Sequence, residues 1–184
     1  MFVGDKMKKT MENEIDKRYS EILRNLYVNW MLGLKNKNEE LKSKGLDTSG
    51  VGIEIIYNLI EKLAFNTCEN LDNMFEDIKK EFNTKIPLKV LKKYIDKSIN
   101  SIFGHLNNMQ EDIANKFGND ILVQSNESSI NNIKGNVKAK LERIYDKNKN
   151  LQKFKKIEWL VIINTIATIG GFIISIIGLI KSYK

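Results

Sequence analysis

Apolar residues recur every three or four positions along the first 120 residues, with Glu, Lys and Asn between them. This spacing predicts amphipathic helices that each bury one apolar stripe. We expect the first helix from about Lys9 to Lys44, with Gly45 as its stop, because glycine is favoured just past a helix end. Its stripe comprises Ile15, Tyr19, Ile22, Leu23, Leu26, Trp30, Met31 and Leu34.

Two further apolar stripes follow, and turn residues separate them. The polar residues at 47–49 are candidate N-caps for a second helix. Thr84 and Pro87 mark the break before a third helix, since proline is well suited to the first turn of a helix. The third stripe ends near Gly118, which predicts two more long helices connected by short loops.

A fourth helix is expected after the polar residues 125–129. Neither Pro nor Gly separates Asn136 from Ala167, so the pattern predicts one continuous helix that reaches the C-terminal region. Period-two alternation is brief everywhere, and no strand is predicted. The expected fold is all-α: an antiparallel bundle of three to four long helices, whose last helix continues into a single transmembrane helix. The apolar positions of the fourth helix are Ile130, Ile133, Val137, Leu141, Ile144, Leu151 and Phe154.

The stretch from Trp159 to Ile180 contains 22 residues without a charged side chain. As a helix it would be about 33 Å long, which exceeds the hydrocarbon thickness of about 30 Å. This stretch predicts a transmembrane helix. The predicted organisation is therefore a helical bundle at 1–120, a connecting segment and basic stalk at 121–156, a membrane helix at 157–180 and a short tail at 181–184.

Lysines cluster immediately before the predicted membrane helix. Positive charge favours the cytoplasmic side, so the N-terminal body is expected in the cytoplasm of a single-pass, tail-anchored membrane protein. The same cluster would also be attracted to anionic lipid. Trp159 stands where an interfacial aromatic anchor is expected. The cluster comprises Lys147, Lys149, Lys153, Lys155 and Lys156.

Small and polar residues recur within the predicted membrane helix at spacings of 4, 3, 4 and 3, which places them on one helix face. Small residues allow close helix packing in lipid, so this face predicts self-association, or a pore lining in a larger ring. Gly, Ser and Thr are also common in membrane anchors without such a role. The residues are Asn164, Thr168, Gly171, Ser175 and Gly178.

Composition narrows the classes of partner. The formal net charge is +7, but the basic residues are 27 Lys and only 3 Arg. Because bidentate recognition of guanine and phosphate favours Arg, specific nucleic-acid binding is not expected. The 22 Asn and 26 Ile are typical of AT-rich coding, which reduces the weight of any single Lys or Asn.

Few residues could support catalysis. His105 is the only histidine, and Cys68 has no histidine nearby in sequence to activate a thiolate nucleophile. Glu69, Asp72 and Glu76 share a helix face, but the lysines that follow indicate a solvated charged surface. No catalytic, cofactor-binding or metal site is predicted, and an enzyme is not expected.

The leading hypothesis is a non-enzymatic interaction or scaffold protein at the cytosolic membrane face, with a protein partner on the helical bundle and self-association into a homo-oligomer. The alternative is a membrane-disrupting effector, of toxin or phage-defence type, whose anchors cluster when triggered. The order of three helices, a heptad helix and a tail anchor resembles that of syntaxin-type SNAREs. The heptad positions run only from about Ile130 to Phe154, roughly half of what such a motif needs, and no family is assigned.

Overall fold

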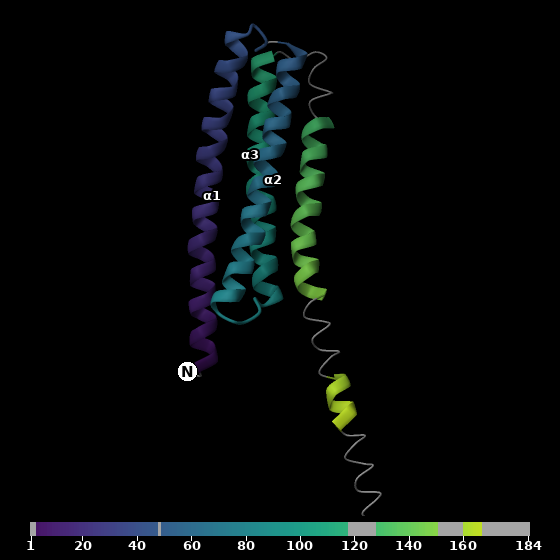
Figure 1. Cartoon of the computed structure of the whole chain (residues 1–184). Helices are drawn as coiled ribbons and strands as arrows, with labels where there is room; N and C mark the ends of the chain where they lie inside the picture. The colour runs from purple at the N-terminus through teal and green to yellow at the C-terminus, as the bar shows by residue number, and fades with distance from the viewer. Residues whose placement is uncertain (1–2, 48, 118–127, 151–159, 167–184) are drawn as a thin grey trace, which may run out of the picture. The chain divides into compact units, whose positions relative to one another are not determined.

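A computed structural model describes residues 3–47, 49–117, 128–150 and 160–166 (Figure 1). All secondary structure in these ranges is helical, which confirms the predicted all-helical class. The chain divides into two compact units, Met1–Tyr145 and Asp146–Lys184. The helices are α1 (Val3–Ser43), α2 (Gly50–Glu81), α3 (Leu88–Phe117) and two further helices at 128–150 and 160–166.

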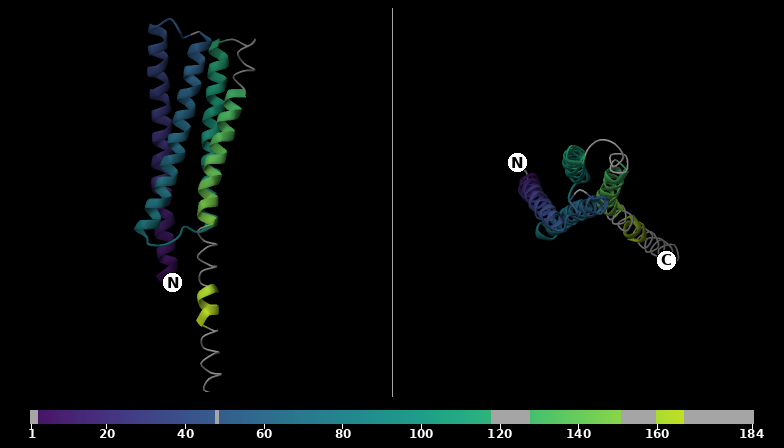
Figure 2. Two further views of the ribbon diagram at one scale, coloured as in Figure 1. Left: turned by 45° about the vertical axis from the view of Figure 1, so that its right-hand side comes forward. Right: turned by 90° about the horizontal axis from the view of Figure 1, so that it is seen from above.

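The first unit is a helical bundle, as the apolar stripes predict. Helices α1 and α3 run in one direction, while α2 and the helix that begins at residue 128 run in the opposite direction (Figures 1 and 2). Consecutive helices are therefore antiparallel, as the short α1–α2 and α2–α3 connections require. The predicted boundaries of the bundle, stalk and tail stay a prediction.

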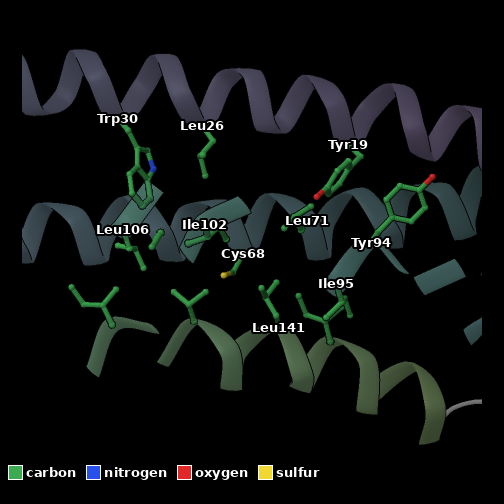
Figure 3. Packing of buried hydrophobic residues seen from close by; sticks show 14 of the residues in the cluster. Tyr19, Leu26, Trp30, Cys68, Leu71, Tyr94, Ile95, Ile102, Leu106 and Leu141 are labelled. Carbon is green, nitrogen blue, oxygen red and sulfur yellow. The ribbon is translucent and has the colours of Figure 1, made fainter. Parts of the chain in front are cut away.

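A continuous apolar core joins the helices of this unit. Side chains from α1 and from the helix at 128–150 point toward one another across α2 and α3 (Figure 3). Tyr19 of α1 and Tyr94 of α3 meet edge to face, with ring centroids 5.1 Å apart, an arrangement that aromatic pairs prefer. Fully buried members include Ile15, Ile60, Leu71, Ile78, Leu91, Ile102, Leu106, Ile130 and Leu141.

The corner between α1 and α2 depends on two glycines and a serine. Gly45 has φ +66°, and the amides of Gly45 and Leu46 donate to the carbonyls of Lys42 and Leu41 at 3.1 and 2.9 Å. This is a Schellman motif, so the predicted helix stop at Gly45 is confirmed. Ser49 caps α2, because its Oγ accepts a hydrogen bond from the amide of Gly52 at 3.0 Å.

The connection between α2 and α3 uses a residue that the sequence pattern does not indicate. Asn83 has φ +44°, a left-handed conformation that asparagine tolerates better than most residues. Pro87 immediately precedes α3, and its carbonyl accepts a hydrogen bond from Leu91 at 3.0 Å. The break expected at Thr84 and Pro87 is thus present, with the turn itself at Asn83.

Polar contacts fix the register of the helix at 128–150 against α2 and α3. Lys140 forms an ion pair with Glu69 of α2 at 2.8 Å, and Lys134 donates to Asn107 of α3 at 2.6 Å. The Lys140 ammonium also lies 4.9 Å from the ring centroid of Phe65. Exposed pairs of this kind each contribute at most about 1 kcal/mol, so the apolar core provides most of the helix's attachment.

The predicted membrane localisation is contradicted. No helix within the described ranges is long and apolar enough to cross a membrane. Of the predicted span at 157–180, the structure describes only residues 160–166, which are helical. The remaining residues of that span, and the predicted tail at 181–184, lie outside the described residues.

Candidate protein-interaction surface

Of the predicted basic cluster, interfacial anchor and oligomerisation face, the structure describes three residues. Lys147 and Lys149 are exposed on the helix at 128–150, and Asn164 is exposed on the helix at 160–166. The predicted oligomerisation face and basic cluster therefore stay predictions. The others lie outside the described residues, namely Lys153, Lys155, Lys156, Trp159, Thr168, Gly171, Ser175 and Gly178.

The most unusual surface of the bundle lies on α1. Tyr27, Val28, Met31 and Leu32 expose 54%, 45%, 57% and 54% of their surface. Positions i, i+1, i+4 and i+5 of a helix are neighbours on one face, so the four side chains form one continuous surface. We call these four residues the α1 apolar patch. Such a patch on a polar surface is a common mark of a protein-binding site.

The helix around the patch is apolar on nearly every side. Leu26 and Trp30 retain only 4% and 2% exposure and face the bundle, while the patch residues between and after them face away. A helix that is apolar all round is usually buried all round. Here the bundle buries only one side of this segment.

The predicted stripe for this helix is partly wrong at this point. The stripe includes Met31 in the buried face, yet Met31 is the most exposed of the four patch residues. The signal that could locate the patch is the run at 26–32, in which only Asn29 is polar. Such a run leaves apolar residues on both faces of a helix. The spacing of three or four residues that defines an apolar stripe selects only one of these faces.

His105 of α3 lies beside the patch. Its ring centroid is 5.7 Å from that of Tyr27 and 6.0 Å from that of Trp30. Burial disfavours the charged imidazolium and lowers the pKa of His105 below its usual value. The imidazole ring packs against both aromatic side chains and so supports the contact between α1 and α3.

We expect the bundle to lose stability as the pH falls below the usual pKa of histidine, near 6.5. The unfolded chain binds the His105 proton near pH 6.5, whereas the folded chain binds it only at lower pH. The contribution of uncharged His105 to stability is fully present above the pKa that this residue has in the unfolded chain. It is lost as the pH falls from that value through the pKa of His105 in the folded chain. Urea unfolding of wild type and His105→Gln between pH 7.5 and 5 measures the free energy of unfolding of each protein as a function of pH. Parallel pH profiles for the two proteins would exclude the effect.

An asparagine-lined groove of about 470 Å³ lies between α1 and α2. Its floor is apolar and buried at Leu26, Trp30 and Met74. Exposed amides form its rims, and each amide carries both donors and acceptors. The rim amides are Asn25 and Asn29 on α1 with Asn66, Asn70 and Asn73 on α2.

Charged and buried polar groups define the two ends of this groove. Arg18, at one end, pairs with Glu14 of its own helix at 2.8 Å and with Glu81 of α2. These hydrogen bonds hold the pKa of the Arg18 guanidinium above its usual value. Toward the other end, the buried Nε1 of Trp30 has no hydrogen-bond partner among the residues that the structure describes. The rim amides of this groove can therefore donate hydrogen bonds to, and accept them from, a bound molecule.

The described side chains offer little for catalysis or metal binding. Within the described ranges, no group of three or more His, Cys, Asp or Glu could hold a metal ion. Cys68 is fully buried, and burial raises the pKa of its thiol to about 11, which leaves it protonated at neutral pH. The expectation that the chain is not an enzyme stays a prediction.

Comparisons of the chain with protein-family models, curated proteins and solved structures find no match.

Proposed function

We propose that this chain is a non-enzymatic helical interaction module that binds a protein partner through the α1 apolar patch. The observation that carries the proposal is the exposure of four large apolar side chains on one face of α1, between 45% and 57% each. The same helix closes a well-packed core on its other side, so the exposed face does not result from a loose bundle.

The size of the patch limits what it can do alone. Burying a large apolar side chain completely contributes about 1.5–3 kcal/mol, so four half-exposed side chains offer roughly 3–6 kcal/mol. Association costs about 4–15 kcal/mol in lost freedom of motion. A stable complex therefore needs contacts beyond the patch, and the groove amides on the α2 side of α1 are available for hydrogen bonds.

A comparison of substituted chains tests the proposal. Affinity-tagged wild type, Met31→Glu and Asn13→Glu would be isolated from the source cells, and the bound proteins quantified by mass spectrometry. Asn13 is a matched control, because it is exposed and lies 18 residues, or five turns, before Met31 on the same line of α1. We expect a partner that Met31→Glu loses at least tenfold and Asn13→Glu retains. The same bound proteins with all three chains would refute the proposal.

A further inference from the structure

The groove between α1 and α2 is lined by amides that the bundle itself does not use. Asparagines are five of its fourteen described lining residues, about three times their frequency of 22 in 184 in the whole chain. All five are exposed, and none forms a side-chain hydrogen bond within the described part of the chain, whereas Asn107 and Asn136 do. AT-rich coding alone does not gather asparagines in one groove.

The amides form two rows, one on each helix. The α1 row is Asn25 and Asn29, and the α2 row is Asn66, Asn70 and Asn73. Contacts on either side of the rows fix their register. Arg18 pairs with Glu81 at one end, and a Cβ at Gly33 would lie 3.6 Å from Leu63 toward the other. Because α1 and α2 are antiparallel, the two rows lie level with each other on opposite rims of the groove (Figure 2).

An extended peptide has the geometry that these rims and floor require. Its side chains alternate between two faces, and the N–H and C=O groups of every second residue point to the same edge. Two extended residues advance about 6.6 Å, close to the roughly 6 Å between amides one turn apart on a helix. One Asn amide can donate to the carbonyl and accept from the N–H of the same residue. An extended chain between the rows therefore bonds to both rims, and every second side chain meets the apolar floor.

Charge and exposure disfavour other classes of ligand. Arg18 is the one cation of the described lining, and it already pairs with two carboxylates. Glu21 and Asp77 add exposed carboxylates, so the groove would repel the phosphates of a nucleic acid. Trp30 is the one aromatic residue of the described lining, and it exposes only 2% of its surface, which leaves no ring face for a base to stack on. A neutral main chain with alternating donors and acceptors matches the groove better.

We propose that this groove binds an extended segment of the partner protein through hydrogen bonds to the segment's main chain. The inference rests on the proposed function: Asn25 and Asn29 lie three residues before Val28 and Leu32 of the α1 apolar patch, so one partner covers both surfaces. The α2 row is about 10 Å long, which corresponds to three or four extended residues. Main-chain bonds supply affinity, and the side chains over the apolar floor supply selectivity.

Peptide selection on substituted chains tests the role of the amides. Short random peptides displayed on phage are selected on the immobilised full chain, and fluorescence anisotropy measures the affinity of each. The groove variant is Asn29→Ala with Asn70→Ala. Its matched control is Asn13→Ala with Asn58→Ala, at exposed positions of the same two helices outside the groove. We expect peptides that the groove variant binds at least tenfold more weakly and the control retains. A selection that yields no such peptide would overturn the inference.

Two scans of a groove-dependent peptide test its bound conformation. In an alanine scan, an extended segment loses affinity at every second residue, whereas a helix loses it at every third or fourth. Replacing main-chain amides by esters, one at a time, removes single N–H donors. We expect a loss of about threefold to tenfold for each bonded residue. A period of three or four, or tolerance of every ester, would contradict main-chain recognition of an extended segment.

Capture from the source cells separates this inference from the proposed function. We expect the groove variant to retain less of the partner that Met31→Glu loses. Capture of that partner at the wild-type level by the groove variant, together with its loss by Met31→Glu, would refute the extended segment and leave the interaction function standing. Groove-dependent peptides without any loss of cellular proteins in Met31→Glu would refute the α1 apolar patch and leave the peptide site.

Discussion

Leu141→Ala is expected to lower the free energy of unfolding by about 2–5 kcal/mol. Leu141 is fully buried in the helix at 128–150 and belongs to the core shared with α1, α2 and α3. Truncation to alanine removes apolar contacts and leaves a cavity that the surrounding helices fill only in part. Urea unfolding followed by circular dichroism would measure the change.

Leu32→Ala is the matched control for this substitution. It removes the same atoms from a residue with 54% exposure in the α1 apolar patch, and a surface change of this kind is expected to stay within about 0.5 kcal/mol. A large difference between the two variants means that the helix at 128–150 is an integral part of the bundle. Equal effects would show that this helix does not contribute to the core.

Gly52→Ala is expected to cost about 3 kcal/mol, which is large for the addition of one methyl group. A Cβ at position 52 would lie 2.0 Å from the carbonyl oxygen of Leu46. Because that oxygen belongs to the backbone, the corner between α1 and α2 must open to relieve the clash. Thermal and urea unfolding would both report the loss.

Gly45→Ala separates this clash from the effect of backbone conformation. Gly45 has φ +66°, but a Cβ added there would meet no heavy atom within 4 Å, so only the left-handed conformation is penalised, by about 1–2 kcal/mol. We expect Gly52→Ala to be clearly the more destabilising of the two. The opposite order would show that the corner is not packed as described.

Much of the bundle could be predicted from local rules. Gly45 and Pro87 are strong signals, because their backbone preferences act independently of the rest of the fold. The turn at Asn83 was not predicted, since asparagine occurs 22 times in this chain and a single one indicates little. The membrane helix is predicted from the length of the uncharged stretch at 159–180, and the described helices do not bear it out.

The interaction surface was harder to predict than the fold. Periodicity identifies an apolar stripe, but where apolar residues surround a helix it cannot show which side meets a neighbour. Met31 and Trp30 are adjacent and both apolar, yet one exposes 57% of its surface and the other 2%. Only the placement of α2 and α3 against α1 determines which of the two side chains is buried.

Site-specific photo-crosslinking tests the central claim most directly. A photoreactive benzoylphenylalanine would replace Leu32 in one chain and the control residue Asn13 in another, followed by irradiation in the source cells. If α1 binds a partner through its apolar patch, the probe at position 32 will join a distinct protein and the probe at position 13 will not. Absence of any crosslinked protein at position 32, or the same products from both positions, would contradict the account.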